Sequence, residues 1–109
     1  MDIEKLDWAA PWRSLSTEQE AVGLQRQLDR ELTGRHPLSG RGATVIGRRV
    51  DRDDVLVVLF DGTYANVHLT WGLSSVDQFA DEYPTWFAYG TLDDFVLAMS
   101  NDSRDDGDA

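Results

Sequence analysis

Hydrophobic residues recur every three or four positions between Thr17 and Gly34, in the stretch TEQEAVGLQRQLDRELTG. This spacing is typical of one buried face of an α-helix, and the residues that share the face are Ala21, Leu24, Leu28 and Leu32. A capping box formed by Thr17 and Glu20 predicts where the helix begins. Gly34, with Pro37 shortly after it, predicts where it ends. The first third of the chain therefore contains one amphipathic helix.

The hydrophobic pattern after residue 42 is that of β-strands. Segments that are short and rich in β-branched or aromatic residues are ATVIGRRV at 43–50, VLVVLF at 55–60, TYANVHLTW at 63–71 and TWFAY at 85–89. Between the second and third segments, Asp61-Gly62 predicts a two-residue hairpin loop in a type I′ turn, because both central residues of that turn need positive φ. These segments predict a mainly antiparallel sheet of about four strands.

The segment at 63–71 has two unlike faces, because side chains alternate across a strand. The apolar face, which we expect to meet the helix, carries Ala65, Val67, Leu69 and Trp71. The polar face, which we expect to meet solvent or a partner, carries Tyr64, Asn66, His68 and Thr70. Beyond it, residues 72–84 predict a loop with a turn of helix in its middle.

The C-terminal region predicts a short helix over TLDDFVLAMS at 91–100, with a second capping box formed by Thr91 and Asp94. Residues 101–109 lack an apolar anchor and predict a disordered acidic tail. The fold class that follows is α+β. One domain over 1–100 has its N-terminal helix packed on the sheet and a short helix at its C-terminal end.

Charge is the most informative global property, with a net charge of −10 over 109 residues. From Asp53 to Ser103 there are nine acidic residues and no Lys or Arg. Such a half projects a negative field that attracts a basic partner and repels nucleic acid, so we expect no binding to DNA or RNA. The charged first residues and the lack of a long apolar stretch predict a cytoplasmic protein that does not enter a membrane, and the absence of cysteine excludes disulfides without deciding the compartment.

Candidate chemistry centres on His68, because imidazole is the side chain best suited to proton transfer near neutral pH. The only other histidine, His36, lies in a loop without the spacing that pairs two imidazoles on a helix face. The paired acids do not fit a calcium loop, and no phosphate-binding or dinucleotide-binding motif is present. We therefore expect no metal, no cofactor and no enzymatic activity. The alternative is a small hydrolase or transferase with His68 as base and an Asp to orient it.

Acidic and aromatic residues alternate around the last predicted strand. Asp81 and Glu82 come just before Tyr83, Trp86 and Phe87, and this combination suits ion pairs and cation–π contacts with a basic protein. We expect Phe87 to be in the core. The residues predicted to contact a partner are Tyr64, Asn66, His68, Asp77, Asp81, Glu82, Trp86 and Tyr89.

The order of short motifs along the chain resembles a group of small bacterial proteins of uncharacterised function. The motifs are PW at 11–12, REL at 30–32, HPL at 36–38 with Gly40, RR at 48–49, DDVL at 53–56, DG at 61–62 and VHLTW at 67–71. The chain is also similar in size and charge to immunity proteins that neutralise bacterial toxins. By that analogy we predict an immunity-type inhibitor that binds a toxin with a basic surface. A third hypothesis is a nucleic-acid mimic that inhibits a defence protein.

Overall fold

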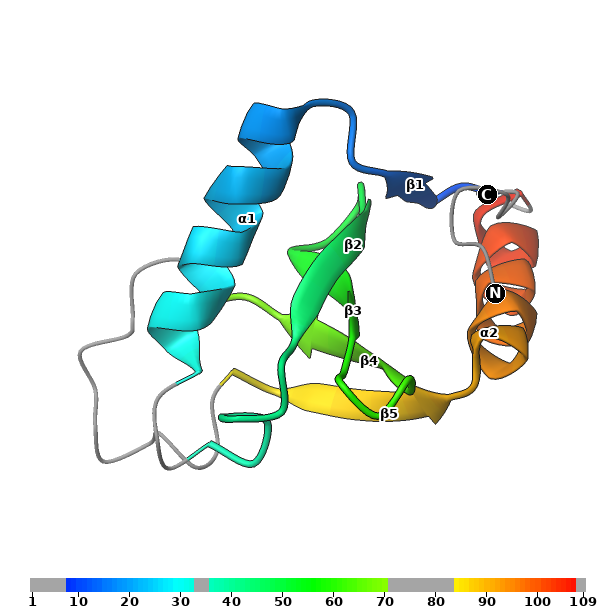
Figure 1. Cartoon of the computed structure of the whole chain (residues 1–109). Helices are drawn as coiled ribbons and strands as arrows, with labels where there is room; N and C mark the ends of the chain where they lie inside the picture. The colour runs from blue at the N-terminus through cyan, green and yellow to red at the C-terminus, as the bar shows by residue number, and fades with distance from the viewer. Residues whose placement is uncertain (1–7, 33–35, 71–83, 108–109) are drawn as a thin grey trace.

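The computed structural model describes residues 8–32, 36–70 and 84–107. Five antiparallel strands follow one another in chain order across a single sheet: β1 (Trp12–Ser14), β2 (Thr44–Arg49), β3 (Asp54–Val58), β4 (Tyr64–His68) and β5 (Trp86–Gly90). Two helices, α1 (Glu18–Glu31) and α2 (Leu92–Gly107), lie on opposite sides of it (Figure 1). The α+β class and the antiparallel sheet are confirmed. The sheet has one more strand than predicted, because the three residues of β1 pair with β2.

The predicted apolar face of α1 packs on one side of the sheet. Leu24 and Leu28 join a buried cluster with residues from the middle strands, which are Val45, Val55, Val57, Ala65 and Val67. Leu69 belongs to the same cluster, so the apolar face predicted for this strand does meet the helix. Trp71 and the predicted stop signal at Gly34 lie outside the described residues.

The second helix covers the opposite face of the sheet, with Phe95 fully buried among Trp12, Leu56 and Tyr64. The Thr91 hydroxyl accepts a hydrogen bond from the Asp94 backbone N–H at 3.2 Å, so the predicted cap is confirmed. The structure continues α2 to Gly107, into the segment whose composition predicts disorder. A tertiary contact between the two ends of the chain supports the longer helix, because the Asp102 carboxylate accepts the Trp12 indole N–H at 2.9 Å.

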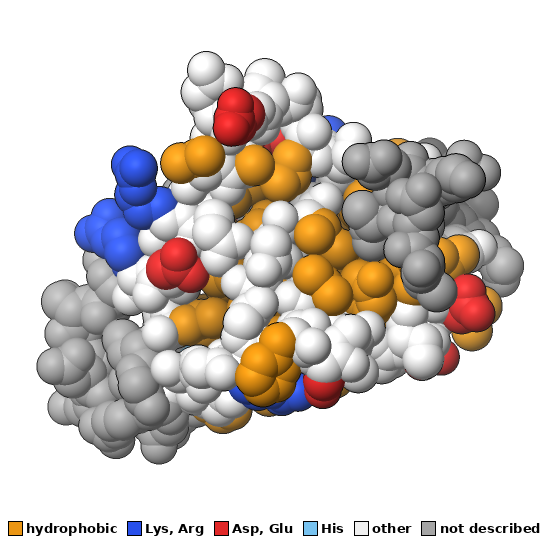
Figure 2. Space-filling view, in the orientation of Figure 1, with side chains coloured by type: hydrophobic (Ala, Val, Ile, Leu, Met, Phe, Trp, Pro, Cys, Tyr) orange, Lys and Arg blue, Asp and Glu red, His pale blue; other side chains and the backbone are white. Residues whose placement is uncertain are grey.

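Large hydrophobic side chains also reach the surface. Figure 2 shows hydrophobic groups in the middle of one face, with charged groups scattered around them. The most exposed large hydrophobic residues of the described chain are Val22, Val50, Phe60, Phe87 and Leu97.

Within the described residues, no helix is both long and apolar enough to cross a membrane.

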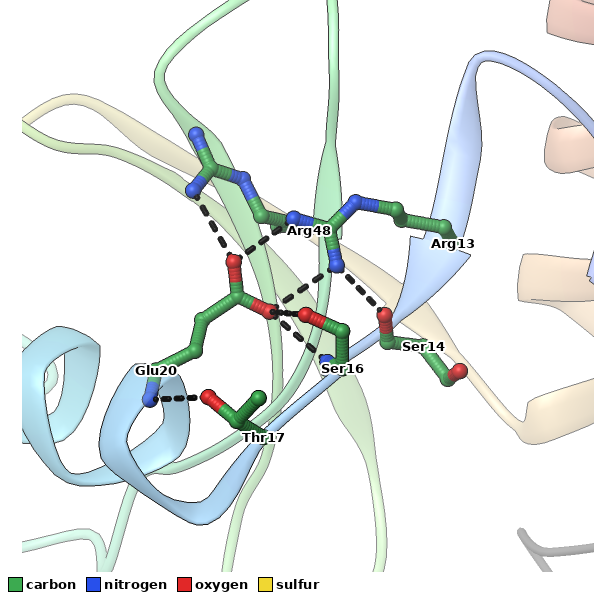
Figure 3. Close-up of polar contacts among 6 residues, drawn as sticks. All are labelled: Arg13, Ser14, Ser16, Thr17, Glu20 and Arg48. Carbon is green, nitrogen blue, oxygen red and sulfur yellow. Dashed lines mark hydrogen bonds and ion pairs between the residues drawn. The ribbon is translucent and has the colours of Figure 1, made fainter.

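The start of α1 is tied to the sheet through Glu20 (Figure 3). The Thr17 hydroxyl accepts the Glu20 backbone N–H at 3.0 Å, as the capping box predicts. The Glu20 carboxylate accepts two hydrogen bonds from the Arg13 guanidinium, at 2.9 and 2.6 Å, and pairs with Arg48 at 3.4 Å. It also accepts the backbone N–H of Ser16 at 2.8 Å. One carboxylate therefore joins β1, α1 and β2.

These contacts predict a pH-dependent contribution of Glu20 to stability. Hydrogen bonding from Arg13, which outweighs the opposing effect of burial, lowers the pKa of Glu20 from 4.5 to about 2. The stabilisation is therefore complete above the ordinary carboxyl pKa and is lost as the pH falls toward about 2. We expect Glu20→Gln to lose about 1–2 kcal/mol at neutral pH, since the ion pairs are partly screened by solvent.

Urea unfolding of both proteins between pH 7 and pH 2.5 measures this effect. The difference between wild type and Glu20→Gln should shrink across the acidic part of this range. Glu18→Gln, which changes an exposed acid in the same helical turn, is the control. A difference for Glu20→Gln that stays constant with pH would contradict the assignment.

Candidate functional site

The turn between β3 and β4 determines which residues form the site. The Gly62 N–H donates to the Leu59 carbonyl and the Leu59 N–H donates to the Thr63 carbonyl, both across a loop of residues 60–62. Gly62 has φ of 86°, which is the usual conformation at the end of such a three-residue loop. The predicted two-residue loop is therefore wrong by one residue. The observed register places Asp54, rather than Val55, opposite His68.

Asp54 and His68 form a hydrogen-bonded pair on the α2 side of the sheet. The distance between His68 Nδ1 and Asp54 Oδ1 is 2.6 Å. The other carboxylate oxygen, Oδ2, accepts a hydrogen bond from Asn66 Nδ2 at 3.2 Å. The same Nδ2 donates to the Tyr89 hydroxyl, also at 3.2 Å. Strands β3, β4 and β5 thus contribute one connected polar network.

The two members of the Asp54–His68 pair differ in exposure. The Asp54 side chain is 8% exposed, whereas the His68 side chain is 51% exposed. A carboxylate only accepts hydrogen bonds, so the proton of a neutral imidazole lies on Nδ1 and leaves Nε2 with a free lone pair. Within the described residues, Nε2 has no hydrogen-bond partner. This arrangement leaves a basic nitrogen accessible to a ligand.

An open groove surrounds this network, and we call it the His68 groove. It consists of two adjoining hollows of about 470 and 320 Å³, which share Arg52, Asp54, Asn66 and Phe87. The remaining lining residues are Arg49, His68, Thr85, Trp86, Tyr89, Ala98, Asn101 and Asp102. The groove lies where α2 leaves part of its sheet face uncovered.

Charged groups on the walls of the groove are mostly paired. Arg49 contacts Asp51 at 2.6 Å and Asp102 at 3.3 Å. Burial opposes the charged form of Arg49, but the hydrogen bond to Asp51 and the charges of Asp102, Asp51 and Asp54 raise its pKa overall. The hydrogen bond from Arg49 lowers the pKa of Asp51. Arg52 is exposed and makes no ion pair within the described residues.

Tyr89 stays protonated at the edge of the groove. Burial raises the pKa of Tyr89 to about 12, and the charges of Asp102 and Asp54 add to this, against the hydrogen bond from Asn66. The hydroxyl therefore retains its hydrogen at physiological pH.

The predicted contact residues have different positions in the structure. His68, Asn66 and Tyr89 come together in the groove. Tyr64 is buried in the α2-side core, and Asn66 is only 3% exposed, so most of the polar face of β4 is covered by structure. Trp86 lines the groove and also packs against the α1-side core. The remaining predicted contacts, Asp77, Asp81 and Glu82, lie outside the described residues.

Eight of the twelve residues that line the groove were missed from the sequence, among them Arg52, Asp54 and Phe87. Phe87 was expected in the core, but 54% of it is exposed. Strand alternation contained the signal, because Phe87 lies on the opposite face from Trp86 and pairs with Asn66. The position of Asp54 opposite His68 follows only from the register of the β3–β4 hairpin.

His36 has a structural role instead of a chemical one. It is 3% exposed, its Nδ1 accepts the Leu38 backbone N–H at 3.0 Å, and its Nε2 lies 2.8 Å from the Pro84 carbonyl oxygen. Since Nδ1 accepts, Nε2 carries the proton and donates to Pro84. The imidazole therefore links the segment after α1 to the start of β5.

Comparisons with protein-family models, with curated proteins and with solved structures found no match. Among the residues that the structure describes, no group of three or more His, Cys, Asp or Glu side chains is arranged to hold a metal ion. Function is therefore inferred from the geometry and charge of the His68 groove.

Proposed function

We propose that the protein is a non-enzymatic interaction protein, an immunity-type inhibitor that binds a toxin through the His68 groove and strand β5. The observation that carries this proposal is the exposed Phe87 ring beside a partly satisfied polar network. Residues that dominate binding at interfaces are commonly aromatic groups surrounded by polar ones. The net charge of −10 supports a partner with a basic surface, since complementary charge speeds association.

Substitution of Phe87 tests the proposal directly. We expect Phe87→Ser to weaken binding to the toxin by at least tenfold, since loss of a central aromatic contact commonly costs about 1–2 kcal/mol or more. Co-expression with a toxin encoded beside this chain measures protection of growth, and titration of the purified pair measures affinity. Phe60→Ser is the matched control, because Phe60 is 76% exposed and does not line the groove.

Three outcomes would count against this function or against the proposed interface. If wild-type protein gives no protection, the immunity function is wrong. If both phenylalanine variants protect as well as wild type, binding does not use β5. If both lose protection while their melting temperatures stay unchanged, the interface is not confined to the groove.

The Asp54–His68 pair favours a second candidate, a small hydrolase or transferase. A carboxylate that holds an imidazole with its other nitrogen free is an arrangement used for general-base catalysis. This candidate predicts turnover of a substrate by wild type and its loss in His68→Gln with an unchanged melting temperature. A wild-type inhibitor instead protects against the toxin and turns over no substrate.

A further inference from the structure

The His68 groove contains two hydrogen-bond acceptors that no donor among the described residues occupies. Both hydrogens of Asn66 Nδ2 are used, by Asp54 and by Tyr89, but Asn66 Oδ1 accepts no hydrogen bond although the residue is 3% exposed. The Nε2 lone pair of neutral His68 is the second acceptor. A buried acceptor without a donor costs free energy, so a ligand that brings N–H groups is favoured.

The charge balance of the groove indicates the sign of that ligand. Among the lining residues, Asp54 and Asp102 carry two negative charges and Arg49 and Arg52 carry two positive charges, and Asp51, which pairs with Arg49 from outside the groove, adds a third negative charge. With His68 neutral, the groove and the adjoining Asp51 together are therefore one charge negative, within a protein of net charge −10. A cation is favoured over a carboxylate or phosphate at this location.

The exposed ring of Phe87 adds a third preference. Phe87 lines both hollows and meets Tyr89 edge-to-face, with ring centroids 5.1 Å apart. An aromatic face attracts a cation through the ring quadrupole. Guanidinium suits this site better than ammonium, because its planar fork donates to several acceptors and stacks on a ring.

We propose that the His68 groove binds the guanidinium group of an arginine side chain that the partner protein contributes. This inference rests on the proposed function and names the chemistry of its contact. The guanidinium donates to Asn66 Oδ1 and His68 Nε2 and lies against Phe87. Arg52 competes with it, because it is a like charge on the wall of the same groove.

The groups that face the site predict its pH dependence. They are Arg49 from β2, Arg52 from the β2–β3 loop, Asp54 from β3, His68 from β4, Tyr89 from β5 and Asp102 from α2. Protonation of His68 turns Nε2 into a donor and adds a positive charge. Binding should therefore weaken once the His68 ring is protonated.

Titration with N-acetyl-arginine amide tests the site without any toxin. Changes in the NMR signals of the Asn66 side-chain amide and the His68 ring report binding, with a dissociation constant on the order of millimolar for so small a probe. N-acetyl-citrulline amide has nearly the same shape without the charge and should bind at least threefold more weakly. Acetate should not move these signals.

Two groove variants and one control variant have distinct expected outcomes. Arg52→Gln should tighten binding of the arginine probe by about threefold, because a competing cation is removed. Arg41→Gln, which makes the same charge change at a residue that does not line the groove, should bind as wild type does. His68→Gln should abolish any weakening of arginine binding at acidic pH.

The inference is overturned if citrulline and arginine probes bind equally, if Arg52→Gln weakens binding, or if the pH dependence survives in His68→Gln. Loss of toxin protection together with normal arginine binding would reject the immunity function and leave the arginine site standing. Protection without any arginine binding would reject the arginine site and leave the immunity function standing.

Discussion

Phe95→Ala should destabilise the protein by about 3–5 kcal/mol, the usual cost of removing a fully buried ring. Phe95 is completely buried and is the point at which three aromatic side chains meet α2. Its ring centroid lies 5.3 Å from Trp12, 5.1 Å from Tyr89 and 6.1 Å from Trp8, all in edge-to-face geometry. Chemical unfolding followed by tryptophan fluorescence measures the loss.

The same helix supplies the control for this prediction. Leu97 is 67% exposed, so Leu97→Ala should change stability by less than about 0.5 kcal/mol. Since Phe95→Ala threatens a domain of marginal stability, Phe95→Leu serves as a milder variant with an expected cost of about 1–2 kcal/mol. If both Phe95 variants are as stable as wild type, the aromatic cluster does not hold α2 to the sheet.

Gly47→Ala should destabilise the protein by about 1–3 kcal/mol through overpacking. A Cβ atom at residue 47 would lie 2.3 Å from the Trp8 ring and 3.2 Å from the Arg13 carbonyl oxygen. The distance to Trp8 is shorter than a Cβ contact allows, so the methyl group displaces the Trp8 ring from its position against Gly47. A red-shifted tryptophan emission in the folded state should accompany the loss of stability.

Gly23→Ala is the matched control, because the same methyl group there meets no atom within 4 Å. Gly23 lies inside α1 at an exposed position, where alanine is favoured over glycine by about 0.5–1 kcal/mol. The two substitutions should therefore have opposite signs. Equal effects would show that crowding by Trp8 contributes nothing.

Much of the fold follows from local sequence pattern. The three-to-four spacing of Leu24 and Leu28 identifies the buried face of α1, and Thr17 and Thr91 cap the two helices as their motifs predict. The alternation in β4 correctly assigns Ala65, Val67 and Leu69 to the core. These features depend on neighbours within a few residues, so the sequence contains them directly.

The candidate site depends on contacts that local pattern does not encode. A two-residue loop at Asp61-Gly62 would place Val55 opposite His68, and the observed three-residue loop places Asp54 there instead. A shift of one residue exchanges the two faces of a strand, so the whole Asp54–His68 pair depends on the conformation of Gly62. The sequence contains the glycine, but both loops accept it.

The position of α2 decides which polar and aromatic residues remain accessible. Alternation places Tyr64, Asn66 and His68 on one face of β4, but the helix buries Tyr64, Asn66 is buried beside Asp54 and Tyr89, and His68 stays exposed. It likewise packs on Tyr89 and leaves Phe87 exposed. The sequence by itself determined the elements and the faces of their strands, because these arise from short-range periodicity. Only the tertiary structure decided where the second helix stops covering the sheet, because that boundary depends on packing between residues distant in the chain.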